Sequence, residues 1–333
     1  MSNVIDSMIV QMKKNKTPVL RLTDDNSPCI VHQWISTGVD VLDIIMSDGK
    51  TIGGLPIGRM IEIYGDEAVG KSLLAIQATA QAQANGYAVL YIDTESAVSI
   101  SVMETLGVNL SDMMYDDPDT VEDVFSLIES AINAKALVDK NAPLLIIWDS
   151  VAATTTKIEK DSGFDKANVA SQARAISAGL RKIIRTLSDN NVCLVLINQT
   201  RDKIGVTFGD PETTSGGNAI KYYASIRLRL KYHGKIKEDK RVVGVKTSVN
   251  VTKNKVGQPF RSASLPIYFN FGVDNAEATF EFLKDAEVLE GGAGGNWSIT
   301  MPDGNVLKFR TTGFGDIYEA NRDAFIEIMR QTL

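Results

Sequence analysis

The chain has 333 residues and a formal net charge of −6 at pH 7. Hydrophobic residues make up 44% of it and charged residues 23%, a balance typical of a globular protein with a sizeable core. The acidic balance excludes a uniformly basic nucleic-acid binder, so any nucleic-acid site must be local. The two cysteines, Cys29 and Cys193, are far apart, and only two histidines are present, which excludes a disulfide framework and a zinc cluster.

Membrane and export signals are missing from the sequence. No apolar run reaches membrane-spanning length, and the first residues lack the apolar core of a signal peptide. We therefore expect no membrane partner and a location in the reducing cytoplasm.

The first predicted element is a short amphipathic helix. Its apolar residues recur at helical spacing: Val4, Ile5, Met8, Ile9 and Met12. Residues 15–33 are polar and contain Pro18 and Pro28, so they offer this helix no partner. The helix either packs back on its own domain or docks on a neighbouring subunit, and the sequence leaves both open.

A phosphate-loop motif, G-x-x-x-x-G-K-[ST], is matched without a mismatch by Gly65, Asp66, Glu67, Ala68, Val69, Gly70, Lys71 and Ser72. The alternating run 59–64 predicts a strand entering the loop, and 72–85 predicts a helix leaving it. In that setting backbone N–H groups face a phosphate, Lys71 reaches the β- and γ-phosphates, and the Ser72 hydroxyl ligates Mg²⁺. This context makes a chance match in a glycine-containing turn the weaker interpretation.

Beyond the loop the chain alternates between strands and helices, which indicates a parallel sheet. Three apolar strands and one helix are predicted, over 88–93, 143–148, 192–197 and 121–138. Ligands of such sheets collect beyond the carboxyl ends of the strands, where this chain carries polar residues. We therefore expect Glu95, Asp149 and Gln199 to converge on a nucleotide held at Lys71.

Each of these three residues suits a different task in hydrolysis. Asp149 follows four large apolar residues and is suited to hold Mg²⁺ through water. Glu95 is suited to orient and deprotonate the attacking water. Gln199 is neutral and forked, which suits it to sensing a γ-phosphate. A polar residue that merely ends a strand is the plainer alternative for each.

A long helix is predicted over 167–187, with an apolar stripe formed by Val169, Ala173, Ile176, Leu180, Ile183 and Leu187. Arg174, Arg181 and Arg185 fall on nearly the opposite side. Such a basic stripe is more often an ordinary solvated face than a binding surface. Here two polar loops flank it, over 157–166 and 200–218.

The second of these loops carries Arg201, Lys203, Ile204, Phe208, Gly216 and Gly217. A glycine-rich loop with cations and apolar side chains can hold a phosphodiester chain and wedge between its bases. The stripe and the loop together therefore predict a local DNA-binding surface.

From residue 225 the hydrophobic period changes to that of strands. Residues 225–233 and 245–252 alternate, so a long hairpin through 234–244 is predicted, ending at Lys253-Asn254-Lys255. After Val273 the predicted elements are an acidic helix to Glu290, a glycine-rich stretch over 291–295, a hairpin turning at Asp303-Gly304 and a final helix to Arg330. We expect these elements to form a separate small α/β lobe.

Motifs along most of the chain resemble the bacterial RecA recombinase family. They lie at 35–38, 53–56, 62–65, 149–152, 197–199, 203–206, 208–214, 216–219 and 253–255. The stretch 197–225 is far more specific than the phosphate loop, and the resemblance weakens after about residue 273. It implies an α/β fold: a RecA-like P-loop ATPase core with a mainly parallel central sheet, an N-terminal helix and a small C-terminal α/β lobe.

The resemblance also implies an organisation and an activity. The implied segments are an N-terminal helix and polymerisation segment (1–34), an ATPase core with DNA-binding loops (35–272) and a small C-terminal domain (273–333). The implied activity is that of an ATP-dependent recombinase and DNA-dependent ATPase in DNA repair. Such a protein forms a helical homo-oligomeric filament on single-stranded DNA and pairs it with homologous double-stranded DNA, with ATP and Mg²⁺ between adjacent subunits.

Matching motif positions imply residue roles. Glu95 becomes the catalytic carboxylate, Gln199 the link from the γ-phosphate to the second DNA loop, and Lys253 and Lys255 the cations that reach the neighbour's ATP. The phosphate loop through Leu73, with Asp149, binds the nucleotide, and Ser72 and Asp149 hold the metal. The DNA-facing residues are Arg174, Ser177, Arg181, Ile204, Gly216, Gly217 and Asn218, to which the loop adds Arg201 and Lys203. Lys221 and Tyr222 are implied at the subunit interface.

The chain departs from the family's pattern in four ways. Asp66 and Leu73 replace a Pro and a Thr in the phosphate loop, at the expected cost of one phosphate contact. Ser99 and Val102 stand where the family places Asp and Tyr to hold adenine, so we expect loose base selectivity. The first DNA loop is slightly longer, and no acidic tail follows in this sequence, from which we expect no self-inhibition by such a tail.

Two alternatives from other classes stay open. One is a nonhydrolysing filament or mediator subunit, and the other is a ring-forming helicase on the same core. The loop 208–218 argues against the helicase. The intact set of Lys71, Glu95 and Asp149 argues against the inert subunit.

Overall fold

The computed structural model describes residues 2–17, 19–24, 27–47, 49, 53–162, 170–202 and 212–333. The chain divides into two compact units, residues 1–33 and residues 34–333. The first unit holds helix α1 (Ser2–Lys14), whose Val4, Ile5 and Met8 side chains are exposed. Whether this helix packs on its own domain or docks on a neighbour stays a prediction, as does a further division near residue 273.

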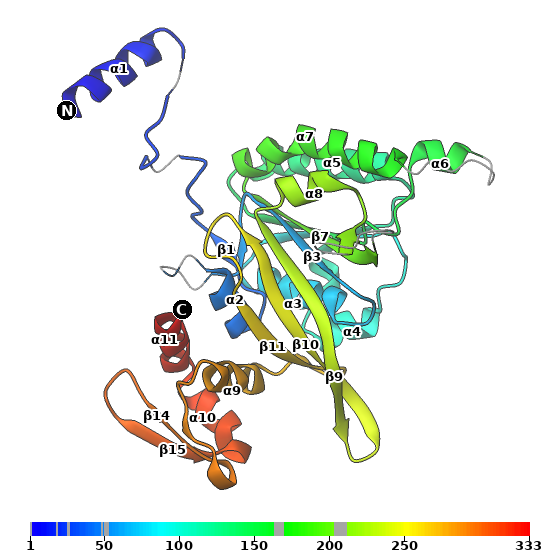
Figure 1. Ribbon diagram of the computed structural model, residues 1–333. Helices are drawn as coiled ribbons and strands as arrows, with labels where there is room; N and C mark the ends of the chain where they lie inside the picture. The colour runs from blue at the N-terminus through cyan, green and yellow to red at the C-terminus, as the bar shows by residue number, and fades with distance from the viewer. Residues whose placement is uncertain are drawn as a thin grey trace. The chain divides into compact units, whose positions relative to one another are not determined.

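The second unit is built on one large sheet, for which the described residues supply ten strands (Figure 1). Its order is β12-β11-β10-β9-β3-β7-β6-β4-β5, with β8 paired to β7. The parallel strands are β3 (Met60–Gly65), β4 (Ala88–Asp93), β5 (Met113–Asp116), β6 (Leu144–Asp149), β7 (Val192–Asp202) and β9 (Ile226–Glu238). The antiparallel partners are β8 (Glu212–Thr214), β10 (Arg241–Asn254), β11 (Ser262–Tyr268) and β12 (Gly272–Val273). This arrangement confirms the predicted α/β class with a mainly parallel central sheet.

Helices cover both faces of the parallel strands (Figure 1). One face packs against α5 (Val121–Asp139), α7 (Ser171–Asp189) and α8 (Asn218–Tyr223), and the other against α2 (Asp40–Met46), α3 (Lys71–Ala84) and α4 (Ile100–Thr105). In β6, for example, Ile146 and Trp148 enter the first core and Leu145 and Ile147 the second. Because both of its faces are buried, β6 is apolar up to its last residue, Asp149, where the polar chemistry begins.

The C-terminal elements are three α-helices and a small sheet of their own, within the described residues. They are α9 (Asn275–Asp285), β13 (Glu290–Gly291), β14 (Asn296–Thr300), β15 (Val306–Arg310), α10 (Phe314–Ala320) and α11 (Arg322–Thr332). The strands pair as a small antiparallel sheet in the order β13-β14-β15. Their apolar side chains join the core that contains α2 and β11, so one hydrophobic cluster runs from the strands of the large sheet to the C-terminal helices. A short pair, β1 (Trp34–Ile35) and β2 (Leu55–Pro56), completes the strands of this unit in the described part of the chain.

Several predicted loops and boundaries were wrong. Residues 157–161 form helix α6 (Lys157–Asp161), because Thr156 and Glu159 make a capping box that the sequence analysis missed. The expected loop 200–218 begins as strand, since β7 runs to Asp202 and pairs with β8. The hairpin strands likewise continue through most of 234–244, leaving a tight turn after Glu238.

Helix boundaries also differ from the predictions. Helix α7 begins at Ser171 rather than 167, and Val169 lies outside the described residues. The acidic helix ends at Asp285, and the final helix is divided into α10 and α11 at Asn321. None of the described helices is long and apolar enough to cross a membrane.

Candidate nucleotide site and DNA-facing surface

The phosphate loop joins β3 to α3 at the carboxyl end of the parallel strands. Gly70 precedes α3 with φ 91°, a left-handed conformation that favours glycine, and a Cβ at this position would lie 2.4 Å from the Cδ1 atom of Ile267. The Lys71 ammonium donates to the Gly65 carbonyl at 3.0 Å and to the Asp66 carbonyl. Burial lowers the pKa of Lys71, while the negative charges of Asp149 and Asp66 oppose that shift. A phosphate entering the loop would compete with the two carbonyls for this ammonium.

The carboxyl ends of β4 and β6 lie side by side, with Asp93 and Asp149 in register. The Asp149 carboxylate accepts hydrogen bonds from the Ser72 hydroxyl and from the Tyr91 hydroxyl, the latter at 2.8 Å. Burial raises the pKa of Asp149, and the two hydrogen bonds act in the opposite direction. The structure thus brings together the two residues predicted to hold the metal. Hydroxyl and carboxylate oxygens are the donors that Mg²⁺ prefers.

Glu95 follows β4 and lies at the same edge of the sheet. The Ser150 hydroxyl donates to its Oε1 atom at 2.5 Å, and the Glu95 backbone N–H donates to the Asp93 carboxylate at 3.2 Å. Ser150 is itself fixed, because its carbonyl accepts a 2.8 Å hydrogen bond from the Thr94 hydroxyl. The Glu95 carboxylate is therefore held by Ser150, the residue after Asp149, and both carboxylates line the same pocket.

Gln199 lies in β7 opposite Gly65, the first residue of the phosphate loop. Its backbone N–H donates to the Asn198 side chain at 2.9 Å. Asn198 is fully buried and donates from Nδ2 to Glu62 at 3.0 Å and to the Ser215 carbonyl at 2.9 Å. Asn198 is thus hydrogen-bonded both to β3, the strand that enters the phosphate loop, and to Ser215, the residue before Gly216.

Glu62 is the member of this network that sequence analysis missed. Its side chain is fully buried, and one carboxylate oxygen lies 2.5 Å from Nε of Arg227 in β9. The Arg227 guanidinium also lies over the Tyr64 ring, 4.4 Å from its centroid. The available signal was an acidic residue inside an apolar strand, because a buried carboxylate requires a partner.

A pocket of about 210 Å³ opens beside the loop. It is lined by Ser72, Leu73, Ile76, Asp93, Glu95, Ala97, Val98, Ser99, Val102 and Asp149. Its carboxylates gather near the loop, whereas the other lining residues are mostly small and apolar. The Ser99 hydroxyl already caps α4 by accepting from the Val102 N–H at 3.4 Å and also bonds Ser101 at 2.9 Å.

Lys253 and Lys255 lie at the end of β10 and bond the end of α8. Both ammonium groups donate to the Tyr222 carbonyl, at 3.0 and 2.9 Å, and Lys253 also donates to the Lys221 carbonyl at 2.5 Å. Burial and the charges of Lys255 and Arg227 lower the pKa of Lys253 to about 8. The side-chain hydrogen bonds described for the two lysines thus go to α8, and none goes to the phosphate loop of the same subunit.

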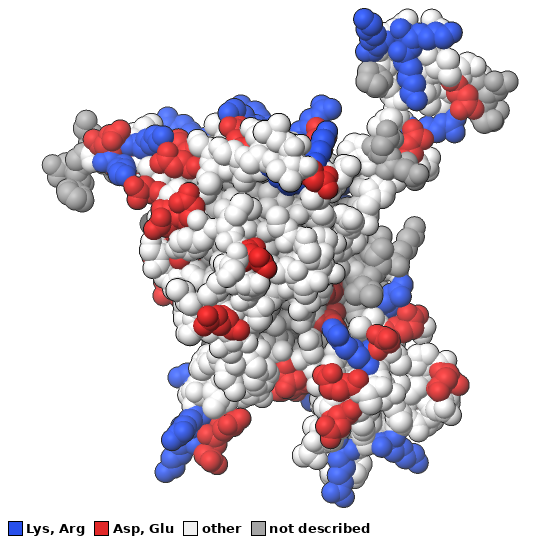
Figure 2. Space-filling view, turned by 180° about the vertical axis from the view of Figure 1, so that it is seen from behind, with Lys and Arg blue, Asp and Glu red and all other residues white. Residues whose placement is uncertain are grey.

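Helix α7 carries Arg174 and Arg181 exposed and Ser177 half-buried. Arg174 donates to the Ala170 carbonyl at 3.2 Å. Nearby cations are paired, since Lys182 lies 3.0 Å from Glu129 and Arg185 lies 3.6 Å from Asp189. Figure 2 shows acidic and basic side chains interspersed along its upper edge, over α6 and α7. The surface is therefore mixed, and a DNA contact there would have to use individual arginines.

The glycine pair before α8 packs closely on α7. A Cβ at Gly216 would lie 2.8 Å from Ile176 Cδ1, and one at Gly217 would lie 2.9 Å from Ala173 Cβ. This contact places Asn218, the first residue of α8, beside α7. Arg201 is exposed near the end of β7, whereas Lys203, Ile204 and Phe208 lie outside the described residues.

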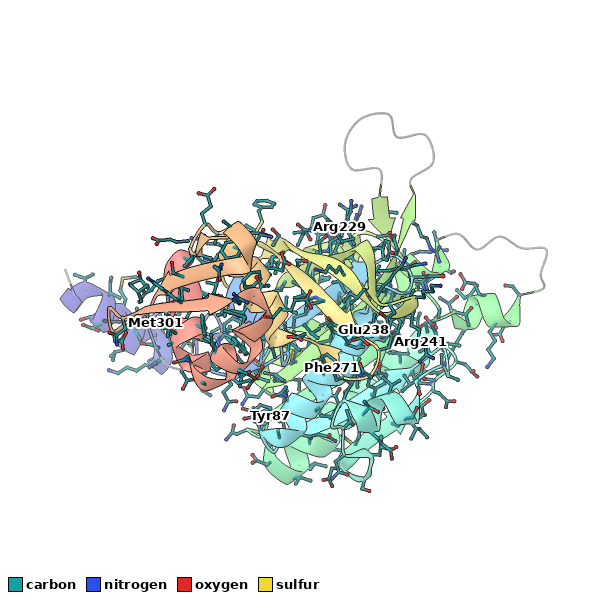
Figure 3. The ribbon with its side chains drawn as sticks, turned by 90° about the horizontal axis from the view of Figure 1, so that it is seen from below. Tyr87, Arg229, Glu238, Arg241, Phe271 and Met301 are labelled. Carbon is teal, nitrogen blue, oxygen red and sulfur yellow. The ribbon has the colours of Figure 1, made fainter. Side chains whose placement is uncertain are left out.

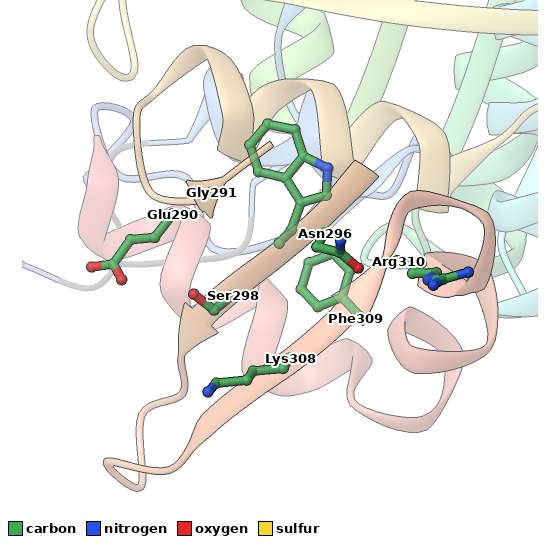
Figure 4. A pocket seen from close by; sticks show the side chains of 8 residues that line it. Glu290, Gly291, Asn296, Ser298, Lys308, Phe309 and Arg310 are labelled. Carbon is green, nitrogen blue, oxygen red and sulfur yellow. The ribbon is translucent and has the colours of Figure 1, made fainter. Parts of the chain in front are cut away.

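A second pocket, of about 600 Å³, lies on the small C-terminal sheet (Figure 4). It is lined by Glu290, Gly291, Asn296, Trp297, Ser298, Lys308, Phe309 and Arg310. No sequence motif marked it, and it shares no lining residue with the pocket beside the phosphate loop.

Comparison with known proteins agrees with this geometry. The family model for the RecA N-terminal domain matches residues 3–274. The chain belongs to the RecA family. Protein RecA of Thioalkalivibrio sulfidiphilus is 39% identical over 285 residues, covering 85% of this chain and 80% of the relative. Protein RecA of Colwellia psychrerythraea is 37% identical over 281 residues (84% and 78%), and that of Cereibacter sphaeroides is 37% identical over 298 residues (89% and 83%).

Membership in the RecA family settles the main activity. The chain is an ATP-dependent recombinase of DNA recombination and repair, and a DNA-dependent ATPase. The phosphate loop and its carboxylates supply the nucleotide part of that activity. The roles of individual residues, the metal and the subunit arrangement go beyond what the comparisons show.

Proposed function

We propose that the chain binds ATP with Mg²⁺ at the phosphate loop and assembles on single-stranded DNA as a helical filament of identical subunits. In that filament it would pair the bound strand with homologous double-stranded DNA. One observation carries this proposal: Ser72, Asp149 and Glu95 line one pocket beside the loop that holds Lys71.

The metal would be held by Ser72 and Asp149. The bound ion would supply charge neutralisation on the β- and γ-phosphates. A single carboxylate and a hydroxyl suit Mg²⁺, which keeps several waters and the substrate phosphates as its other ligands. The described residues contain no cluster of three or more His, Cys, Asp or Glu side chains that would favour a different metal.

Hydrolysis would depend on Glu95, which orients the attacking water and takes up its proton. The Ser150 hydroxyl fixes one Glu95 oxygen and leaves the other for the water. Gln199 would sense the γ-phosphate from the neighbouring strand. The bonds from Asn198 to Glu62 and to the Ser215 carbonyl would carry that signal towards Gly216 and Gly217.

DNA would be bound by α7 and the segments beside it. Arg174 and Arg181 contribute charge, Ser177 a hydroxyl, and Gly216, Gly217 and Asn218 a backbone surface packed against that helix. Arg201, Lys203 and Ile204 would extend this surface. Lys253 and Lys255 would reach the ATP of the adjacent subunit, with Lys221 and Tyr222 at the same interface.

The deciding experiment measures ATP hydrolysis with and without single-stranded DNA, alongside electron microscopy of the assemblies. We expect DNA to stimulate hydrolysis in the unmodified protein, helical filaments with DNA and ATP, and loss of nucleotide binding in Lys71→Ala. DNA-bound filaments without turnover would instead identify a nonhydrolysing subunit. Closed rings that unwind duplexes would identify a helicase.

A further inference from the structure

One phosphate-loop residue makes contacts in two directions. The carbonyl of Asp66 accepts from the Lys71 ammonium, and its carboxylate accepts a hydrogen bond from the Thr200 hydroxyl. Asp66 is exposed and Thr200 half-buried, so this contact lies at the surface of the loop. A direct side-chain bond therefore joins the phosphate loop to β7.

Thr200 lies in β7 between Gln199 and the other residues that pair with β8. It directly follows Gln199 and is paired with Thr214 of β8. Strands β7 and β8 are the two ends of the segment that runs through residues 203–211. A change in the position of Thr200 would therefore act on Gln199 on one side and on the β7–β8 pair on the other.

The negative charge of Asp66 would repel the phosphate groups of a triphosphate bound in the same loop. Asp66 is close enough to Lys71 to favour the charged ammonium, and that ammonium is the group that meets the β- and γ-phosphates. A triphosphate therefore brings several negative charges near the Asp66 carboxylate. At an effective dielectric constant of about 40, one such like-charge pair separated by about 8 Å changes an equilibrium roughly fivefold.

We propose that the Asp66–Thr200 hydrogen bond is a contact that nucleoside triphosphate weakens, so that occupancy of the phosphate loop is transmitted directly to β7 and β8. Without triphosphate, Thr200 holds the carboxylate of Asp66. With triphosphate, repulsion moves the carboxylate away and releases Thr200 beside Gln199. This inference rests on the proposed binding of the triphosphate at Lys71.

The test compares three single variants and one double variant. Asp66→Asn keeps an acceptor for Thr200 but removes the charge. Thr200→Val removes the hydroxyl at nearly constant volume, and Thr200→Ser keeps it as the matched control. The probes are a nonhydrolysable ATP analogue with Mg²⁺, ADP with Mg²⁺ and a labelled single-stranded oligonucleotide.

We expect Asp66→Asn to bind the ATP analogue about fivefold more tightly and ADP at most about twofold more tightly, because the γ-phosphate adds the nearest charge. Thr200→Val should bind the analogue more tightly too, by about twofold, since its Asp66 is no longer held in place. In Asp66→Asn/Thr200→Val the second change should add nothing. Thr200→Val should also reduce the ratio of oligonucleotide affinities with and without the analogue, whereas Thr200→Ser keeps the ratio of the unmodified protein.

Equal or weaker analogue binding by Asp66→Asn would overturn the inference, and so would effects that add in the double variant. An unchanged affinity ratio in Thr200→Val would also overturn it. Failure of the proposed function looks different, because Lys71→Ala would then bind the analogue as well as the unmodified protein does. If Lys71→Ala loses binding and Asp66→Asn behaves like the unmodified protein, only the Asp66–Thr200 inference fails.

Discussion

The two halves of the large sheet are stabilised in different ways. The parallel half, from β4 to β3, is buried on both faces by apolar side chains, whereas the edge strand β5 is largely exposed. The antiparallel half, from β10 to β12, packs on α9 partly through charged contacts, such as Lys246 to Glu277 at 3.1 Å. Its hairpin extends to a turn flanked by Glu238 and Arg241, which lie near each other in Figure 3.

The chemistry divides along the same line. The phosphate loop, Asp149 and Glu95 lie at the ends of parallel strands, whereas Lys253 and Lys255 end an antiparallel strand. Rigid apolar packing suits groups that must be fixed within fractions of an ångström. Polar contacts between elements are easier to rearrange, which suits groups that respond to a neighbour or to DNA. The following predictions test this division.

The largest expected effect is the loss of coupling in the antiparallel half. Replacing both Lys253 and Lys255 by Ala should abolish DNA-stimulated ATP hydrolysis, because both cations of the proposed contact with the neighbour's ATP are lost. The fold should survive, since the side-chain hydrogen bonds described for both lysines go to helix-end carbonyls. Steady-state hydrolysis with and without single-stranded DNA, with circular dichroism, measures both. Lys284→Ala is the control, and undiminished stimulation in the double variant contradicts the prediction.

The attachment of the C-terminal elements to α2 can be broken at one ion pair. Asp40 is 5% exposed and accepts from Arg322 at 2.7 and 2.8 Å and from the Tyr318 hydroxyl. Asp40 holds the pKa of Arg322 above its usual value. Arg322→Ala leaves a buried carboxylate without its cation and should lower the free energy of unfolding by about 3 kcal/mol.

Urea unfolding measures this change in stability. Arg185→Ala, which removes an arginine from an exposed ion pair, should change stability by less than about 0.5 kcal/mol. Similar losses of stability in both variants would mean that the buried Asp40–Arg322 pair contributes no more than an exposed ion pair.

Helix α2 also contains the buried carboxylate of Asp43, whose titration should make the stability of the protein depend on pH. Burial raises the pKa of Asp43 to about 6, against hydrogen bonds from Ser36 and Thr37. Because the folded state keeps the proton that the unfolded state loses near pH 4, Asp43 makes stability fall between about pH 4 and pH 6. The fall should be about 3 kcal/mol. Asp43→Asn should gain stability relative to the unmodified protein as pH rises through this range; a constant difference between them would refute the assignment.

On the parallel half, the arginines of α7 test DNA binding. If Arg174 and Arg181 each neutralise one phosphate, replacing both by Ala should reduce the slope of log affinity against log salt by about one to two. Fluorescence anisotropy with single-stranded DNA at several salt concentrations gives the slope. Arg185→Ala, whose side chain faces Asp189, should leave it nearly unchanged. An unchanged slope in the double variant would mean that these arginines lie on an ordinary solvated face and do not contact DNA phosphates.

The smallest expected effect concerns the base of the nucleotide. Ser99 already caps α4, and Val102 offers only an apolar surface, so the pocket contains no free acceptor at these two positions for an adenine amine. Phe269, 57% exposed, is able to stack from a neighbouring subunit but adds no polar group. GTP and dATP should therefore support hydrolysis within about tenfold of ATP, since one such contact contributes about 1 kcal/mol. Competition among the four triphosphates on DNA-bound protein decides; a thousandfold preference for ATP would show that another residue reads the base.

The part of the protein that the sequence predicted best is the edge of the sheet that carries the phosphate loop. The phosphate loop, the apolar strands and the polar residues at their ends are all local patterns, and Asp149 contacts Ser72 as the topology of a parallel sheet required. Strand pairing was harder to predict, because β8 is three residues long and its partner residues in β7 lie 10 to 14 positions earlier in the chain. Short elements of this kind carry too little periodicity to be recognised before their partners are known.

The sequence by itself determined the family, the phosphate loop and the set of carboxylates, because these depend on residue types at fixed spacings. Only the tertiary structure decided which polar groups touch. Asn198 meets Glu62 and the Ser215 carbonyl, and Asp66 meets Thr200, across 136, 17 and 134 positions of the chain. Such contacts leave no local pattern, since a buried or paired polar side chain needs one suitable partner in space and sets no requirement on its sequence neighbours.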